Sequence, residues 1–190
     1  LARFGRPSRF VTVLPKGDLG DAADDHLRVF GVDTSRIIRK RGRLGLYFIE
    51  KGSGQRPARV IYDRAGSAFS ELNPREIDWD FVFKDAVWFH WTGITPALGS
   101  NVFKALYEGM ERARAKGITI SADLNFRKKL WTEEQAREAM TNLMPFVDIM
   151  IGNEEDPARV FGMEAEGADL KSGRIHAEGY RMLTKELVDR

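Results

Sequence analysis

The second half of the chain alternates between short apolar runs and segments with helical periodicity. Three mainly apolar runs have the length and composition of buried strands, at 86–91, 118–122 and 147–151. Between them, segments 100–117 and 133–144 repeat apolar residues at the three- and four-residue spacing of an amphipathic helix. Ser100 and Thr132 stand where the N-caps of these helices are expected. This alternation predicts parallel strands joined by crossover helices in a three-layer α/β sheet.

The first third of the chain begins in the same way and then changes character. A short apolar strand stops at Pro15, and a helical segment follows from residue 17 to residue 31. From 36 to 64 the sequence is rich in β-forming residues and glycines and has no helical period, which predicts two or three exposed strands. The pattern therefore divides the chain into a partial α/β core, 1–35 and 66–190, and a small β-lid, 36–65.

The amino-acid composition indicates which kinds of binding partner to expect. Of the 190 residues, 43% are hydrophobic and 31% are charged, and the formal net charge is +2. The basic residues are scattered, so no footprint for nucleic acid or a membrane surface stands out, and no apolar run is long enough to span a bilayer. We therefore expect a small molecule or another protein as partner.

The absence of cysteine bears on chemistry and compartment. It excludes disulfides, thiolate metal sites and cysteine nucleophiles within this sequence. It also fits a reducing compartment, and we take a cytoplasmic location as the default expectation.

Polar residues follow the buried strand 118–122 in the sequence DLNFR. If the chain stays extended there, Asp123, Asn125 and Arg127 face the same side, at the sheet edge where ligands of parallel α/β proteins bind. Arg127 could then hold a carboxylate or phosphate bidentately while Asp123 fixes its fork. The alternative is an ordinary loop in which the two shorter residues cap a turn and Arg127 points to solvent.

A second polar cluster, GNEED, follows the strand 147–151. In one interpretation Asn153 is a helix N-cap and the acids after it occupy the first turn, where the helix dipole favours them. In the other, Asn153, Glu154 and Asp156 lie beside a hydrated magnesium ion, which needs few direct protein ligands. We expect no metal ion bound directly by this chain.

The sequence lacks the common short motifs of nucleotide-binding and hydrolytic sites. No Walker A loop, G-x-G-x-x-G fingerprint or G-x-S-x-G elbow occurs, and the three histidines share no metal-ligand spacing. In the predicted lid, strand alternation puts Tyr62 and Arg64 on one face, and Tyr47 lies in the preceding strand. Taken alone, these residues also fit a solvated amphipathic sheet.

The order of the motifs resembles the PfkB, or ribokinase-like, family of sugar kinases, and within it 2-keto-3-deoxygluconate kinases. The likeness extends from Leu1 to about Gly162 and rests on the segments PSRFVTVLPKGDLGDAADDHLRVFGVDTSRI, GLYFIEKG, VIYDRAGSAFS, FHWTGITPALGS, DLNFRKKLW and GNEED. It implies a ribokinase-like fold with a β-lid, which in this family often forms a dimer contact. It also implies Mg2+-dependent transfer of the ATP γ-phosphoryl group to the primary hydroxyl of an acidic keto sugar.

The resemblance also assigns roles to residues. Tyr47, Tyr62 and Arg64 would contact the sugar from the lid, and Arg127, supported by Asp123 and Asn125, would reach the sugar acid or the transferred phosphate. Asn153 would face the ATP phosphates. The fourth position of the family's N-x-x-E pattern, which would support the magnesium shell, is Asp156 here instead of glutamate, and Glu154 or Glu155 could compensate.

The sequence departs from the family pattern at both ends. The family's N-terminal glycine and asparagine motif, which holds sugar hydroxyls, does not occur in these 190 residues. Neither does its C-terminal G-A-G-D-like motif, which supplies an anion hole and the aspartate that acts as general base. We therefore expect no catalytic base in this chain. The alternatives are another ribokinase-like kinase, of the fructokinase or ribokinase type, and a partial domain without catalysis.

Overall fold

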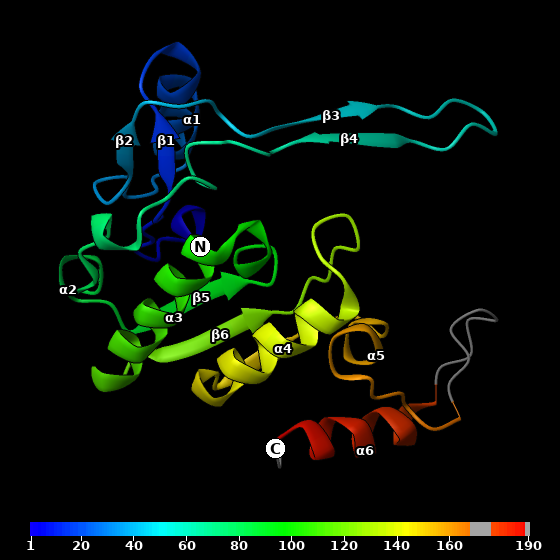
Figure 1. The fold of residues 1–190 in the computed structure, drawn as a ribbon. Helices are drawn as coiled ribbons and strands as arrows, with labels where there is room; N and C mark the ends of the chain where they lie inside the picture. The colour runs from blue at the N-terminus through cyan, green and yellow to red at the C-terminus, as the bar shows by residue number, and fades with distance from the viewer. Residues whose placement is uncertain (168–175, 189–190) are drawn as a thin grey trace. The chain divides into compact units, whose positions relative to one another are not determined.

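The computed structural model describes residues 1–167 and 176–188. Helices and parallel strands alternate, as predicted for an α/β protein (Figure 1). The chain divides into two compact units, one formed by 1–84 with 99–105 and the other by 85–98 with 106–190. Each unit has its own strands and is described by itself.

The first unit begins with a strand–helix–strand motif. After a short 3-10 helix, η1 (Ala2–Phe4), strand β1 (Val13–Pro15) leads into helix α1 (Asp18–Val29) and then β2 (Ile38–Lys40). β1 and β2 pair in parallel, with Val13 opposite Ile38. The helix begins after Gly17, where the apolar strand stops, as the sequence predicts. These elements form the α/β part of this unit.

Strands β3 (Leu46–Glu50) and β4 (Arg59–Asp63) form a separate antiparallel hairpin. Figure 1 shows the hairpin extending away from β1 and β2. The strands predicted between residues 36 and 64 are therefore present, but β2 pairs with β1 and the hairpin contains β3 and β4. The assignment of 36–65 as one functional lid stays a prediction.

Two short helices follow the hairpin, and local capping explains both. Asn73 and Glu76 form a capping box around η2 (Pro74–Glu76), and the Asp78 side chain accepts the N–H of Phe81 to cap α2 (Trp79–Val82). The buried side chains of Trp79 and Val82 hold α2 in the core.

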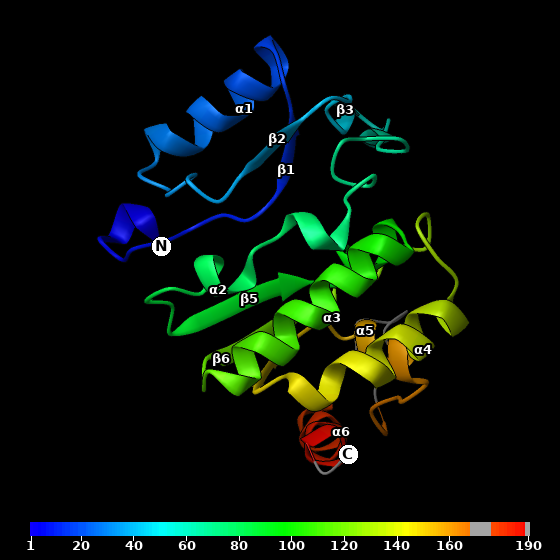
Figure 2. The same ribbon diagram turned by 60° about the vertical axis from the view of Figure 1, so that its left-hand side comes forward.

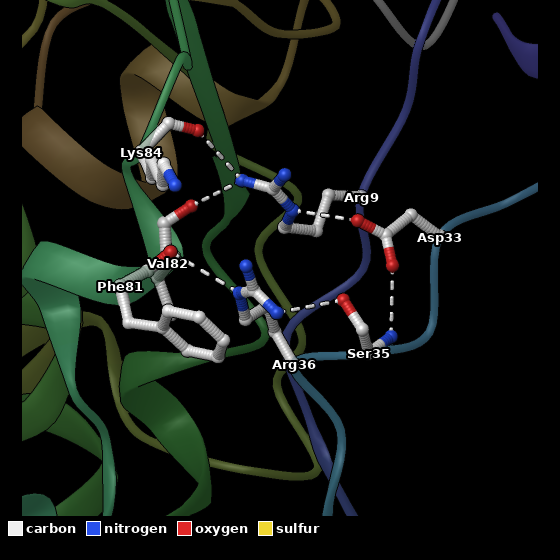
Figure 3. A network of polar contacts seen from close by, with 7 residues as sticks. All are labelled: Arg9, Asp33, Ser35, Arg36, Phe81, Val82 and Lys84. Atoms are coloured by element: carbon white, nitrogen blue, oxygen red, sulfur yellow. Dashed lines mark hydrogen bonds and ion pairs between the residues drawn. The ribbon is translucent and has the colours of Figure 1, made fainter.

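Two arginines tie the end of α2 to the segment after α1 (Figure 3). Arg9 donates to the carbonyls of Val82 and Lys84 at 2.7 and 3.0 Å and to the Asp33 carboxylate at 2.8 Å. Arg36 donates to the carbonyl of Phe81 at 3.1 Å, and its guanidinium lies over the ring of the same residue. Because the last carbonyls of a helix lack intrahelical donors, these side chains satisfy acceptors that would otherwise need water.

The Asp33 carboxylate makes the stability of this network dependent on pH. Hydrogen bonds from Ser35 and Arg9 hold the pKa of Asp33 well below its ordinary value of 3.8. A lowered pKa in the folded state stabilises the protein above the ordinary pKa, and this contribution is lost as the pH falls below it. In urea unfolding, we expect wild type to be more stable than Asp33→Asn at neutral pH, with the difference shrinking from about pH 4 to about pH 2.

The matched control for this prediction is Asp25→Asn. Asp25 is an exposed residue of α1, and its replacement tests whether removal of any surface carboxylate reproduces the effect of Asp33→Asn. A stability difference between wild type and Asp33→Asn that is constant from neutral to acid pH would contradict the predicted linkage.

The second unit contains a three-stranded parallel sheet in the order β5-β6-β7. The predicted alternation of strands and helices is confirmed in chain order. Its elements are β5 (Trp88–Thr92), η3 (Pro96–Leu98), α3 (Ser100–Ala115), β6 (Thr119–Asp123), α4 (Glu133–Leu143), η4 (Met144–Phe146), β7 (Ile149–Ile151), α5 (Asp156–Phe161) and α6 (Ala177–Val188). The beginning of α3, up to Ala105, belongs to the first unit.

Helices α3 and α4 cover one face of this sheet (Figure 2). The core residues include Met110 of α3, Ile120 and Ala122 of β6 and Met140 of α4, all fully buried. On β5 and β7, Trp88, Ile149 and Ile151 are exposed. The described residues thus form two layers here, and the full three-layer arrangement stays a prediction.

No helix within the described ranges is long and apolar enough to cross a membrane.

Candidate functional site

The loops after β5 and β6 meet at the C-terminal edge of the three-stranded sheet. Gly93 donates its N–H to the carbonyl of Asp123 at 2.7 Å. A Cβ atom at Gly93 would lie 1.9 Å from the carbonyl oxygen of Leu124 and 2.8 Å from the side chain of Met140. Glycine at this position is therefore what allows the two loops to approach, and Leu124 itself is fully buried.

Asn125 fixes the direction of the chain after β6. It has a left-handed conformation, with φ of 40°, and its side-chain amide donates to the Thr92 hydroxyl at 3.0 Å. Asparagine tolerates this conformation better than most residues do. The extended interpretation of residues 123–127 is therefore not observed, and the turn with an exposed Arg127 matches the loop alternative. The strand ends at Asp123, because the turn at Asn125 directs its amide back toward β5.

Arg127 lies exposed beyond this turn. Its guanidinium donates to the carbonyl of the preceding residue, Phe126, at 3.0 Å. Among the described residues it forms no ion pair with Asp123, which is half-buried at the end of β6. Ligand binding by Arg127 and support from Asp123 stay predictions, but both residues are at the sheet edge where strand ends and loops converge.

The GNEED segment folds around Asp156. Its carboxylate accepts the N–H of Phe126 at 3.2 Å and that of Asn153 at 3.1 Å. The Asn153 side chain in turn accepts the N–H groups of Glu155 and Asp156 at 2.9 and 3.1 Å. Helix α5 begins at Asp156, so Asn153 precedes the helix start and is not its N-cap, which is Glu155. The loops after β6 and β7 are thus joined through one carboxylate.

The GNEED segment was also considered as a possible magnesium site. No group of three or more carboxylate or histidine side chains suited to a metal ion occurs in the part of the chain that the structure describes. Asp156 is buried and bonded to two backbone N–H groups, whereas Glu154 is exposed. Contacts of Asn153 and Glu154 to the water shell of a magnesium ion stay predictions, and they suit an ion that keeps most of its water ligands.

The hairpin of the first unit brings together the three predicted sugar-binding residues. Tyr47 and Tyr62 are opposite each other in the β3–β4 register, which places them on one face, and their ring centroids are 6.4 Å apart. The Arg64 guanidinium lies 4.5 Å from the centroid of the Tyr62 ring. The predicted shared face of Tyr62 and Arg64 is confirmed. It presents two hydroxyl-bearing rings and a cation.

Sequence reasoning assigned no role to three contributors at the sheet edge, although two of them lie in the segment FHWTGITPALGS that it singled out. They are the Thr92 hydroxyl, the close approach at Gly93 and the backbone N–H of Phe126. A threonine and a glycine directly after a predicted strand are a signal for the first two, because glycine there indicates close backbone contact. A backbone donor has no side-chain signature, so nothing in the sequence marks Phe126.

Comparison with known proteins agrees with the motif order. The model of the pfkB family of carbohydrate kinases matches residues 1–183. The chain is 36% identical over 171 residues to a 2-dehydro-3-deoxygalactonokinase of Haloferax volcanii, a match that covers 90% of this chain and 54% of that protein. It is 35% identical over 136 residues to a 2-dehydro-3-deoxygluconokinase of Bacillus subtilis, covering 70% of this chain and 41% of that one.

Solved structures give the same family. The crystal structure of 2-dehydro-3-deoxygluconokinase from Thermotoga maritima superposes with a TM-score of 0.92 at 44% identity, covering 99% of this chain and 56% of that one. A PfkB family carbohydrate kinase from Listeria grayi superposes with a TM-score of 0.86 at 30% identity, covering 98% and 55%. The chain thus spans about half the length of the relatives it matches. On the family match and these superpositions together, the chain belongs to the pfkB family of carbohydrate kinases.

Proposed function

We propose that the whole protein containing this chain transfers the γ-phosphoryl group of ATP to the primary hydroxyl of 2-keto-3-deoxygluconate, also called 2-dehydro-3-deoxygluconate. The observation that carries the proposal is the 44% identity to the Thermotoga maritima 2-dehydro-3-deoxygluconokinase over nearly all of this chain. The Haloferax volcanii relative is named for the galactonate epimer, so the acidic keto sugar is the common element and the epimer is the finer choice.

The hairpin is proposed to contact the sugar. Tyr47 and Tyr62 offer hydroxyl groups and ring faces, which suit the hydroxyls and C–H groups of a sugar. Arg64, held over the Tyr62 ring, offers a guanidinium that can bind the sugar carboxylate through two parallel hydrogen bonds. A neutral sugar would leave this cation without its partner, which favours an acidic substrate.

The sheet edge of the second unit is proposed to bind phosphate groups. Arg127 would contact the sugar acid or the transferred phosphoryl group, with Asp123 and Asn125 supporting its loop. Asn153 would face the ATP phosphates, with Glu154 beside the water shell of Mg2+. When bound, Mg2+ would neutralise charge on the β- and γ-phosphates. The general base is assigned to a part of the whole protein outside this sequence.

The other face of the hairpin suggests how subunits pair. Phe48 and Ile61 are opposite each other on that face, and both are exposed. A sheet face with exposed apolar side chains is a typical contact between subunits. We propose a homodimer formed through the hairpins, with the Tyr47 and Tyr62 face left to the sugar.

Replacement of Arg64 by alanine tests the acidic substrate. We expect the KM for 2-keto-3-deoxygluconate to rise by a factor of about 10 to 100, since a hydrogen bond to a charged group contributes about 1.5–3 kcal/mol. The KM for ATP should stay unchanged. Steady-state kinetics of the whole protein give both constants.

Arg56→Ala is the matched control, because Arg56 is an exposed cation in the turn of the same hairpin, outside both strands. It should leave the KM for the keto acid unchanged. If Arg64→Ala keeps the wild-type KM for the keto acid, or affects fructose equally, the assignment of an acidic substrate is wrong and a fructokinase-type activity is favoured.

A further inference from the structure

One buried carboxylate connects the two loops that carry Arg127 and Asn153. Asp156 is 3% exposed, and its two oxygens accept different backbone donors. Oδ1 accepts the N–H of Phe126, in the loop after β6, and Oδ2 accepts the N–H of Asn153, in the loop after β7. An ionised carboxylate has acceptors at both oxygens, so this side chain can satisfy both donors at once.

The bond to Phe126 extends to Arg127. The Phe126 N–H is held by Asp156, and the Phe126 carbonyl accepts the Arg127 guanidinium at 3.0 Å. These two groups belong to the peptide units on either side of the Phe126 Cα. Asp156 therefore holds the first unit, and the arginine side chain is directed by the second, one residue further along the same loop.

The bond to Asn153 is reciprocal. The Asn153 side chain accepts the N–H of Asp156, while the Asp156 side chain accepts the N–H of Asn153. Gly152 packs against this pair, since a Cβ there would lie 3.5 Å from the Asp156 Cβ. The conformation of the loop after β7 is thus set by the same carboxylate.

Building on the proposed kinase function, we infer that Asp156 is a positioning residue that couples the Arg127 and Asn153 loops and does not act through the magnesium shell. Its carboxylate is buried and occupied by backbone N–H donors, whereas a contact to hydrated magnesium needs an oxygen directed to water. Through this residue, the phosphate-binding and sugar-binding loops of the proposed site keep a fixed separation.

The variant Asp156→Glu separates positioning from a magnesium role. Glutamate restores the N-x-x-E pattern of the family, so an acid that acts on the magnesium shell would keep or improve activity. For a positioning residue the longer side chain displaces both loops, and we expect the KM for ATP and for the keto acid each to rise about tenfold. The Mg2+ concentration for half-maximal rate should stay unchanged.

The matched control is Asp148→Asn. Asp148 is also a carboxylate that accepts a backbone N–H, that of Ile120 at 2.8 Å, and it pairs with Arg114, but it lies at the opposite end of β6 and β7. Its replacement should lower the melting temperature while leaving both KM values unchanged. A rise in both KM values for Asp148→Asn would show that general destabilisation explains the effect, and would overturn the inference.

Amide hydrogen exchange, followed by NMR without ligands, gives a readout independent of activity. In wild type the N–H groups of Phe126 and Asn153 should exchange slowly. In Asp156→Asn at least one of the two should exchange at least about tenfold faster, because the amide offers one acceptor oxygen where the carboxylate offers two. In Asp148→Asn the N–H of Ile120 should exchange faster, while those of Phe126 and Asn153 should exchange at the wild-type rate.

The outcomes separate the inference from the function on which it rests. A wild-type protein that phosphorylates no sugar contradicts the proposed function, and the exchange rates of Phe126 and Asn153 still decide whether Asp156 holds the loops. Fast exchange of these two N–H groups in wild type overturns the inference. So does an Asp156→Glu enzyme with wild-type KM values and a changed Mg2+ requirement.

Discussion

Replacement of Arg127 by alanine is expected to lower kcat/KM for 2-keto-3-deoxygluconate about a hundredfold. The guanidinium lies exposed at the C-terminal edge of the parallel sheet. Without a ligand, it donates to the Phe126 carbonyl at 3.0 Å. Removal of a charged, bidentate donor costs about 3 kcal/mol of transition-state stabilisation, which corresponds to a factor of roughly a hundred. Steady-state kinetics of the whole protein measure this change.

Whether the loss appears in kcat or in KM identifies the group that Arg127 binds. A rise in KM for the keto acid indicates a contact to the sugar carboxylate. A fall in kcat with unchanged KM indicates a contact to the phosphoryl group during transfer. Lys128→Ala is the control, since it removes the neighbouring exposed cation. If Arg127→Ala has the same kcat and KM as both Lys128→Ala and wild type, Arg127 does not belong to the proposed site.

Replacement of Gly93 by alanine is expected to destabilise the protein by at least about 3 kcal/mol. The added Cβ would overlap the carbonyl oxygen of Leu124, which is backbone and buried in the core, and would press on Met140. Neither neighbour can move without shifting β6 or α4. Urea unfolding compares the free energy of unfolding of the variant with that of wild type.

The control for the glycine prediction is Gly54→Ala. Gly54 also lies in a turn, with φ of 58°, but nothing lies within 4 Å of its Cβ position. Its replacement should cost about 1 kcal/mol, from backbone strain alone. Equal costs at the two glycines would mean that the close approach between Gly93 and Leu124 is not needed for stability.

The sequence predicted the elements well because their signals are local. Thr132 was recognised as a cap from the residues that follow it, and the structure shows its side chain accepting the N–H of Gln135. The strands β5, β6 and β7 were visible as apolar runs between amphipathic helices. Each of these signals depends on a few neighbouring residues.

The site could be predicted only in part, because its contacts join residues far apart in the sequence. The pairing of Tyr47 with Tyr62 follows from the hairpin register, which strand alternation alone does not give. The turn at Asn125 depends on the Thr92 hydroxyl, and the placement of Asp156 depends on the N–H of Phe126. The assumption of an extended chain failed at Asn125 because it ignored the partner on β5.

The pairing of β2 shows the same limit on a larger scale. The sequence places Ile38–Lys40 next to the hairpin, and composition groups all three strands together. In the structure β2 pairs with β1, since the helix between them returns the chain to the side of the first strand. Pairing across a helix is a long-range property, and neither propensity nor periodicity encodes it.

The central claim is tested most directly by the substrate profile of the whole protein. With ATP and Mg2+, the rate of ADP formation is measured with 2-keto-3-deoxygluconate, its galactonate epimer, fructose and ribose. We expect kcat/KM for 2-keto-3-deoxygluconate to exceed the values for both neutral sugars by at least about a hundredfold. The value for the galactonate epimer should lie between them. Turnover of fructose or ribose without turnover of either keto acid would contradict the claim.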